Sequence, residues 1–263
     1  MIRALLLLAL SQPSPQKLYQ EGTAAFEAGD FVRAETLYRQ AWRGEPATLE
    51  FERALGATIA SQGRFGEALP HLEKACRQST PPLPNRGLAC YQWGRTLFYL
   101  QKPAEALEAY RMAKQAAPFT AQMYLGRAQA LDALGQVKEA DLEFRHALSE
   151  SALRAQESAQ IQLVYGNFLA RQGKHDAAIW QFEQALTKAP SDQRIWQEKA
   201  KSLLAMGRER EAAEALEKAL AQGAATGSRN RETVLLLGRV YQRLGQADKA
   251  KRFLDEADGK RNP

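Results

Sequence analysis

The sequence is poor in the residues that carry chemistry. It has three histidines and two cysteines in 263 residues, and His71, His146 and His175 lack the spacing that places two histidines on one helix face for a metal ion. The motifs GxxxxGK, GxSxG and HExxH, which mark phosphate-binding loops, serine hydrolases and zinc proteases, do not occur. The sequence therefore predicts no enzyme, no cofactor, no metal site and no catalytic residue.

Long hydrophobic runs are also missing. The seven apolar residues 4–10 are too few to span a bilayer, so no transmembrane segment is predicted. They follow Arg3 and precede a break rich in proline, an order typical of a secretory signal peptide that is cleaved after Ser11. Residues 1–14 are thus predicted to be a signal and short linker, which places the protein outside the cytoplasm, in the periplasm or secreted. The alternatives are an apolar helix that caps the fold or a start codon that lies upstream, and without a signal the location is cytoplasmic.

A strong excess of one charge is absent as well. Lysine and arginine number 36 against 30 acidic residues, which gives a net charge of +6 and a pI of 9.3. Nucleic-acid binding needs a basic stripe interleaved with aromatic residues rather than a small excess spread along the chain, so nucleic acid is disfavoured as a partner. The hydrophobic content of 45% and charged content of 25% are typical of a globular chain.

What the sequence does have is an internal repeat. Small and large residues recur in the order Gly166, Gly173, Ala178, Phe182, Ala185 and Pro190. Two packed helices need this order: a small residue where the axes approach, a glycine at the turn, a large apolar wedge between small residues, and a proline that ends the second helix. The same order recurs from Gly22 and Gly94, with Gln101 replacing the turn glycine in the second of these copies. It recurs without the terminal proline from Gly56, Ala128, Ala200 and Gly238.

This pattern, with a period of about 34 residues, resembles the tetratricopeptide repeat family. The resemblance implies an all-α fold, a right-handed α-solenoid of seven helix–turn–helix repeats at 15–48, 49–86, 87–120, 121–158, 159–192, 193–230 and 231–263. Each repeat would bury its apolar stripe against its neighbours. Because proteins of this family mainly bind other proteins, it also implies a protein-interaction scaffold. A helical-repeat protein that binds nucleic acid and a structural subunit that assembles with itself remain alternatives, and no oligomeric state is predicted.

Repeat lengths alternate between 34 and 38 residues, which spaces equivalent glycines 72 residues apart. The four extra residues fall at three places, namely 80–86, 150–158 and 222–230. Prolines predict a loop at the first place and Gly223 and Gly227 a loop at the third, whereas residues 152–155 predict that the helix continues at the second. In the last repeat Lys251 and Asp258 stand where other repeats are apolar, which predicts a terminal repeat with a solvent-facing surface.

By resemblance, the outward face of each first helix lines a concave groove that holds extended peptides. The residues expected to bind the partner there are Tyr19, Arg53, Tyr91, Arg95, Tyr99, Asn167, Arg171, Lys201, Arg239 and Arg243. Few acids are expected beside them, namely Glu27, Asp132 and Glu198. Such a surface predicts a protein or peptide partner with acidic and apolar residues. Thr23, Phe26, Ala57 and Phe98 are expected on the same face, although both phenylalanines could instead pack sideways into neighbouring repeats.

The two cysteines fall at the junction of two repeats. Cys76 ends one second helix and Cys90 begins the next first helix, and antiparallel packing brings these ends together. In an oxidising compartment they can form a disulfide that closes a loop of about 15 residues. The alternative is a pair of small buried apolar side chains.

The export prediction can be tested on the mature protein. If residues 1–11 are a cleaved signal, the chain recovered from the envelope or the medium of the producing cells begins at Gln12. N-terminal sequencing and intact mass measure this directly. A recovered chain that still carries Met1 would rule out a cleaved signal.

Overall fold

The computed structural model describes residues 13–42, 49–78, 85–118, 120–225 and 230–259. These residues contain fourteen helices and no strand, so the predicted all-α fold is confirmed. The N-terminal apolar run, with its predicted signal, lies outside the described residues. Among the described helices, none is long and apolar enough to cross a membrane.

The chain divides into two compact units, residues 1–143 and 144–263, which are considered separately. The first contains α2 (Pro15–Glu27), α3 (Phe31–Trp42), α4 (Leu49–Ser61), α5 (Phe65–Arg77), α6 (Arg86–Tyr99), α7 (Pro103–Ala116) and α8 (Ala121–Ala133). The division falls within α9 (Val137–Ser151). The second unit contains α10 (Ala155–Arg171), α11 (His175–Lys188), α12 (Gln193–Ala205), α13 (Glu209–Ala225), α14 (Arg231–Arg243) and α15 (Ala247–Ala257).

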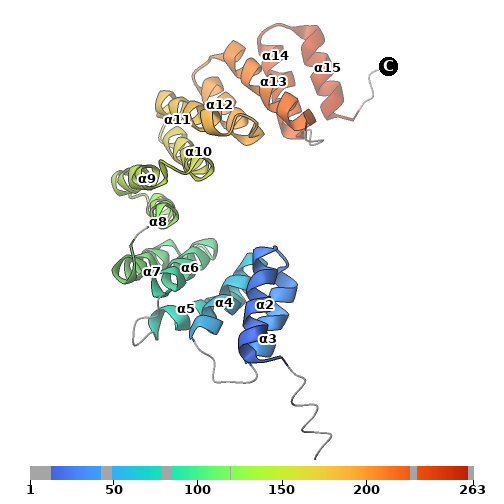
Figure 1. The fold of residues 1–263 in the computed structure, drawn as a ribbon. Helices are drawn as coiled ribbons and strands as arrows, with labels where there is room; N and C mark the ends of the chain where they lie inside the picture. Colours follow the sequence, from blue (N-terminus) through green and yellow to red (C-terminus); the bar gives the residue numbers. More distant parts are fainter. Residues whose placement is uncertain (1–12, 43–48, 79–84, 119, 226–229, 260–263) are drawn as a thin grey trace, which may run out of the picture. The chain divides into compact units, whose positions relative to one another are not determined.

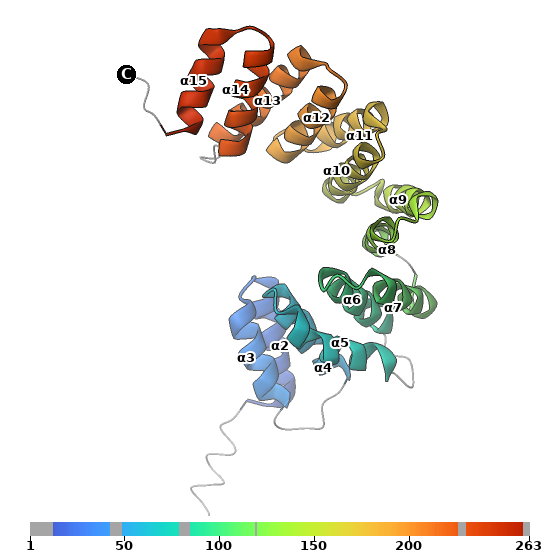
Figure 2. The same ribbon diagram turned by 180° about the vertical axis from the view of Figure 1, so that it is seen from behind.

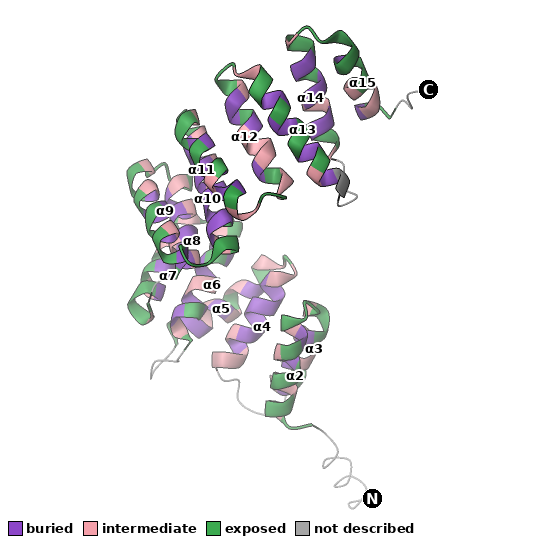
Figure 3. Ribbon diagram, turned by 45° about the horizontal axis from the view of Figure 1, so that its top comes forward, coloured by how far each residue is buried: buried purple, intermediate pink, exposed green. Residues whose placement is uncertain are grey.

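Within each unit the helices form hairpins that pack side by side (Figures 1 and 2). In the first unit α2 packs on α3, α4 on α5 and α6 on α7, and each hairpin also contacts the next. In the second, α10 packs on α11, α12 on α13 and α14 on α15. Figure 3 shows the outcome: the buried residues form stripes along the helices, and the other sides of the helices are exposed.

The turn inside each hairpin depends on a residue with positive φ. Six turn glycines have φ between 71° and 80°, namely Gly29, Gly63, Gly135, Gly173, Gly207 and Gly245. At Gly173 the amide donates to the carbonyl of Ala170, and the next amide, of Lys174, donates to Leu169, so the last carbonyls of α10 are satisfied. Gln101, which replaces the turn glycine in one repeat, takes the same conformation with φ 61°.

The two helices of a hairpin approach where a glycine faces a large wedge. A Cβ added to Gly94 would lie 2.7 Å from the Tyr110 ring, and one added to Gly56 would lie 2.8 Å from Leu72. At Gly166 it would overlap the ring of Phe182. These wedges are buried, so the small–large order of the sequence sets the spacing of the helix axes.

The structure corrects two predictions about the four-residue insertions. At the second place the helix does not continue: α9 ends at Ser151, and α10 begins at Ala155, so the extra residues lengthen the following first helix. The Ser151 hydroxyl donates to the carbonyl of Leu148, and the Arg154 guanidinium donates to that of Glu150 at 2.9 Å, which satisfies the end of α9.

At the third place the predicted loop is wrong for Gly223, because α13 continues to Ala225. Gly223 is buried there, so tertiary packing outweighs its poor helix propensity. Residues 226–229, with Gly227, and most of the first insertion, residues 79–84, lie outside the described residues.

A disulfide joins Cys76 of α5 to Cys90 of α6 in the structure. Their Cα atoms are 4.7 Å apart, and both residues are completely buried. The bond ties the second hairpin to the third across residues 79–84, which lie outside the described part of the chain. The two cysteines are therefore placed both for a bond and for apolar packing.

The hairpin contact can be tested at Gly166. We expect Gly166→Leu to destabilise the protein by roughly 1–3 kcal/mol or more, because the first carbon of the side chain already meets Phe182. Gly66→Leu is the matched control, since Gly66 is an exposed helical glycine in α5 whose added Cβ meets nothing within 4 Å. Thermal and urea melts of both variants measure the difference. If Gly166→Leu melts like the parent, this helix pairing is wrong.

The disulfide can be tested by its effect on stability. Oxidised protein should contain no free thiol under denaturing conditions, and reductant should lower its stability by about 3 kcal/mol in the chain-entropy model for a loop of this length. The double variant Cys76→Ala/Cys90→Ala should show no response to reductant. Thiol counting and paired melts provide the data, and free thiols in protein from an oxidising compartment would refute the bond.

Candidate partner-binding face

All ten predicted binding residues lie on the first helices of the hairpins. In the first unit Tyr19 is on α2, Arg53 on α4, and Tyr91, Arg95 and Tyr99 on α6. In the second unit Asn167 and Arg171 are on α10, Lys201 is on α12, and Arg239 and Arg243 are on α14. We call the surface of α2, α4 and α6 that carries the first set the first-helix face of that unit.

The first-helix face contains a cavity of about 200 Å³. Its lining includes five residues that the repeat pattern places on this face, Tyr19, Thr23, Phe26, Arg53 and Ala57. It also includes Glu27, Tyr38, Ala54 and Gln92. Sequence reasoning assigned Tyr38 only to the wedge of the first hairpin, but its hydroxyl end also reaches the cavity, where it pairs with the Thr23 hydroxyl at 3.1 Å. A wedge tyrosine, rather than leucine, is the signal that could have revealed this.

Arg53 is not the free cation that the sequence predicts. Its Nη2 and Nε donate to the same oxygen of Glu50, at 2.6 and 3.1 Å, and the Tyr19 hydroxyl donates to that oxygen at 3.1 Å. Asn85 adds a longer bond of 3.4 Å. Glu50 was missed as a facing acid, although its position three residues before Arg53 on a helix permits the pair.

This network shifts the pKa values of its members. Burial tends to raise the pKa of Glu50, but the hydrogen bonds and charge of Arg53 outweigh burial and lower it below its usual value. Burial first, and then the charge of Glu50, raise the pKa of Tyr19 to about 12. Glu50 is therefore ionised and Tyr19 neutral near pH 7, and the guanidinium of Arg53 is neutralised locally.

The predicted residues on α6 are better placed than Arg53 to contact a partner. Arg95 is exposed and forms no ion pair with the described residues. Tyr99 is 54% exposed, and its ring stacks on Phe65 with centroids 4.7 Å apart. Tyr91 is half-buried against Tyr110. Arg95 thus stands as an unpaired cation between two aromatic side chains of one helix, a combination suited to anchoring a partner.

The two phenylalanines take different positions. Phe26 packs on Phe31, with ring centroids 5.3 Å apart, and it also lines the cavity. This side chain therefore contributes both to packing and to the binding face. Phe98 is partly buried in the core and touches Tyr99 edge-on.

The second unit is less basic on its first helices than predicted. Lys201 donates to Glu198 at 2.8 Å, a bond that raises the lysine pKa, and it lies 4.0 Å from Glu232. Arg243 donates to Glu209 at 2.6 Å. Glu198 is one of the acids that the sequence predicts here, whereas the pairs of Arg53 with Glu50 and of Arg243 with Glu209 were missed. Each acid lies on the same helix as its cation or on an adjacent helix. Only the packing shows which acids come within ion-pair distance of the cation.

The other three predicted residues of the second unit differ in their surroundings. Arg239 is exposed and makes no ion pair with the described residues, and Arg171 is exposed at the end of α10. Asn167 is half-buried, and its side-chain oxygen has no hydrogen-bond partner in the described structure. A hollow beside Lys201 has a volume of only about 10 Å³, enough for roughly one water molecule.

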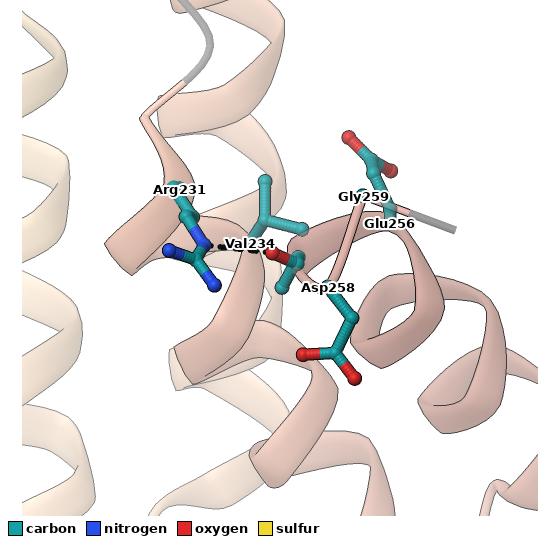
Figure 4. Close-up of a pocket in the computed structure, with 6 residues that line it drawn as sticks. Arg231, Val234, Glu256, Asp258 and Gly259 are labelled. Atoms are coloured by element: carbon teal, nitrogen blue, oxygen red, sulfur yellow. Dashed lines mark hydrogen bonds between the residues drawn. The ribbon is translucent and has the colours of Figure 1, made fainter. Parts of the chain in front are cut away.

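A larger cavity of about 450 Å³ lies at the start of α14 and the end of α15 (Figure 4). Arg231 reaches across it, and its Nε donates to the carbonyl of Ala257 at 2.7 Å, which caps α15. Residues 226–229 and 260–263, which adjoin this lining in the sequence, lie outside the described residues, so we assign it no ligand.

One buried acid away from these surfaces, Glu52, has structural partners. Glu52 is buried and accepts bonds from His71 at 2.6 Å and Lys74 at 2.5 Å, and these bonds overcome the effect of burial and lower its pKa. Among the described residues, no group of three or more histidine, cysteine or acidic side chains is arranged to hold a metal ion.

Solved structures with the same fold are available for comparison. A tetratricopeptide repeat protein from Parabacteroides merdae is 18% identical, with a TM-score of 0.66 over 94% of this chain and 93% of its own. PilW, a type IV pilus biogenesis factor, is 19% identical, with a TM-score of 0.66 over 78% of this chain and 90% of its own. MamA is 20% identical, with a TM-score of 0.56 over 66% of this chain and 96% of its own. At these identities the likeness shows the fold alone.

Sequence comparison covers nearly all of the repeats. No curated protein matches the chain. Models described as tetratricopeptide repeat match residues 19–84 and 91–144, residues 159–202 and residues 203–262. Because these matches coincide with the helical hairpins and turn glycines described above, the chain belongs to the tetratricopeptide repeat family.

Proposed function

We propose that this chain is a protein-interaction scaffold that holds an extended segment of a partner protein against the first-helix face. The family to which it belongs generally serves protein–protein interaction. The observation that carries the proposal is the combination on one face of a cavity of about 200 Å³ with Arg95, an exposed cation that forms no ion pair with the described residues.

The physical case rests on which side chains are ready to bind. Arg95 can donate charge-assisted hydrogen bonds without first breaking an ion pair with the described residues. Tyr99 offers a rigid ring that is half exposed, and such rings lose little conformational entropy on binding. A partner segment with an acidic residue beside an apolar one fits this part of the face. Arg239 offers a similar cation in the second unit.

The scaffold is proposed to act outside the cytoplasm, in an exported complex, and without catalysis. The order of residues 1–15 supports export, and a disulfide between Cys76 and Cys90 is compatible with an oxidising compartment. The alternative of nucleic-acid binding requires cations that are free to meet phosphates. The pairing of Arg53, Lys201 and Arg243 with carboxylates argues against it.

The first-helix face can be tested by reversing one charge. We expect Arg95→Glu to weaken partner binding by more than about tenfold, because an acidic residue of the partner would then face a carboxylate. Its melting temperature should stay close to that of the parent, since an exposed arginine contributes little to folding. Affinity capture from the producing cells, followed by titration of each recovered partner, measures the loss.

Arg111→Glu is the matched control. Arg111 is an exposed arginine on the second helix α7, and Glu108 on the same helix is its one ion-pair partner among the described residues. This variant should capture the same partners as the parent. Normal binding by Arg95→Glu together with loss of binding by Arg111→Glu would move the working surface to the second helices and overturn the proposal.

A further inference from the structure

The cavity on the first-helix face differs in character from the surface around Arg95. Three aromatic rings, of Tyr19, Phe26 and Tyr38, form its walls, and its charged lining residues are Glu27 and Arg53. We propose that this cavity binds a basic side chain, lysine or arginine, of the partner segment. The inference rests on the proposed scaffold function and reverses, for this part of the face, the acidic preference that the sequence predicts.

The first argument is the balance of charge. Arg53 lines the cavity, but two of its guanidinium nitrogens donate to Glu50, so this pair is neutral as a unit. Glu27 is exposed at the cavity and forms no ion pair with the described residues. Two carboxylates therefore stand against one guanidinium, and the cavity has an excess of one negative charge. A cation of the partner would complete the balance.

The second argument concerns the hydroxyl donors of the cavity and its remaining acceptors. The Thr23 hydroxyl donates to the carbonyl of Tyr19, so in its contact with Tyr38 the tyrosine hydroxyl must be the donor. The Tyr19 hydroxyl donates to Glu50. All three hydroxyl hydrogens are thus already donated. The side-chain oxygen of Gln92 is buried and has no hydrogen-bond partner among the described residues, and the Glu27 carboxylate can only accept.

An ammonium or guanidinium group matches the two acceptors that remain. It brings several donors and no acceptor, which suits the Gln92 oxygen and the Glu27 carboxylate. It is also attracted to the faces of aromatic rings such as those of Tyr19, Phe26 and Tyr38. A carboxylate in the same place would bring only acceptors, and it would meet Glu27.

The size of the cavity indicates a side chain rather than a whole small molecule. Its volume of about 200 Å³ is below the range of about 300–1,000 Å³ that is usual for small-molecule sites. It exceeds the roughly 150 Å³ of a cavity that can hold a benzene ring. The cavity is also next to the proposed anchor, because Gln92 and Arg95 are three residues apart on α6. The same partner segment can therefore place a basic residue in the cavity and an acidic residue at Arg95.

The proposal can be tested with single-residue probes on the full chain. The probes are the N-acetyl, N-methylamide derivatives of arginine, lysine, norleucine and glutamate, and saturation-transfer NMR titrations measure their binding. We expect the two basic probes to bind more tightly than norleucine and glutamate. Glu27→Gln should weaken the basic probes by about fivefold, the effect of a single partly exposed ion pair. Ala57→Leu, which fills the cavity, should abolish their binding.

Glu21→Gln is the matched control, because Glu21 is an exposed acid on α2 that does not line the cavity. It should leave binding of the basic probes unchanged. Preferential binding of the glutamate probe would assign the cavity to Arg53 instead, and tightest binding of norleucine would make it an apolar site. Either result overturns the proposal, as does absence of basic-probe binding or an unchanged affinity in Glu27→Gln. None of these outcomes depends on Arg95, so the scaffold proposal stands or falls separately.

Discussion

The close approach of two helices at a glycine is the contact on which the rest of this structure depends. At Gly94 and Gly166 the facing helix inserts Tyr110 and Phe182 so closely that even one added carbon would collide. This contact sets the distance between the axes and therefore the direction in which each first helix presents its other side. Each hairpin buries its apolar stripe only against its neighbours. The distance between the helix axes of one hairpin therefore affects how the next hairpin packs within the unit.

The same contact helps to build the candidate site. Tyr38 is the wedge that faces Gly22, yet its hydroxyl continues beyond the hairpin core and pairs with Thr23 at the cavity. A leucine fills the equivalent place in the second hairpin at Leu72 and carries no polar atom. The first hairpin therefore joins its core directly to its binding surface. This explains why a cavity with polar walls lies there.

Ion pairs divide the first-helix residues into two kinds. Arg53 is held by Glu50, whereas Arg95 forms no ion pair with the described residues, although both project from first helices of neighbouring hairpins. The charge of a paired arginine is already offset by its carboxylate, so the unpaired cation is the better anchor. The electrostatic character of the surface thus depends on local partners and not on the net charge of +6.

The sequence alone was sufficient for the all-α fold, the hairpin turns and the glycine–wedge contacts, because these depend on residue size and backbone conformation at fixed spacing. Gln101, which replaces the turn glycine in one repeat, takes the same positive φ as the glycines. The placement of Tyr19 and Arg53 on one face also followed from periodicity. The tertiary structure alone decided that Glu50 binds Arg53 and that the chain turns after Ser151. Both depend on which side-chain atoms meet, and helical spacing permits several such pairings while packing selects one.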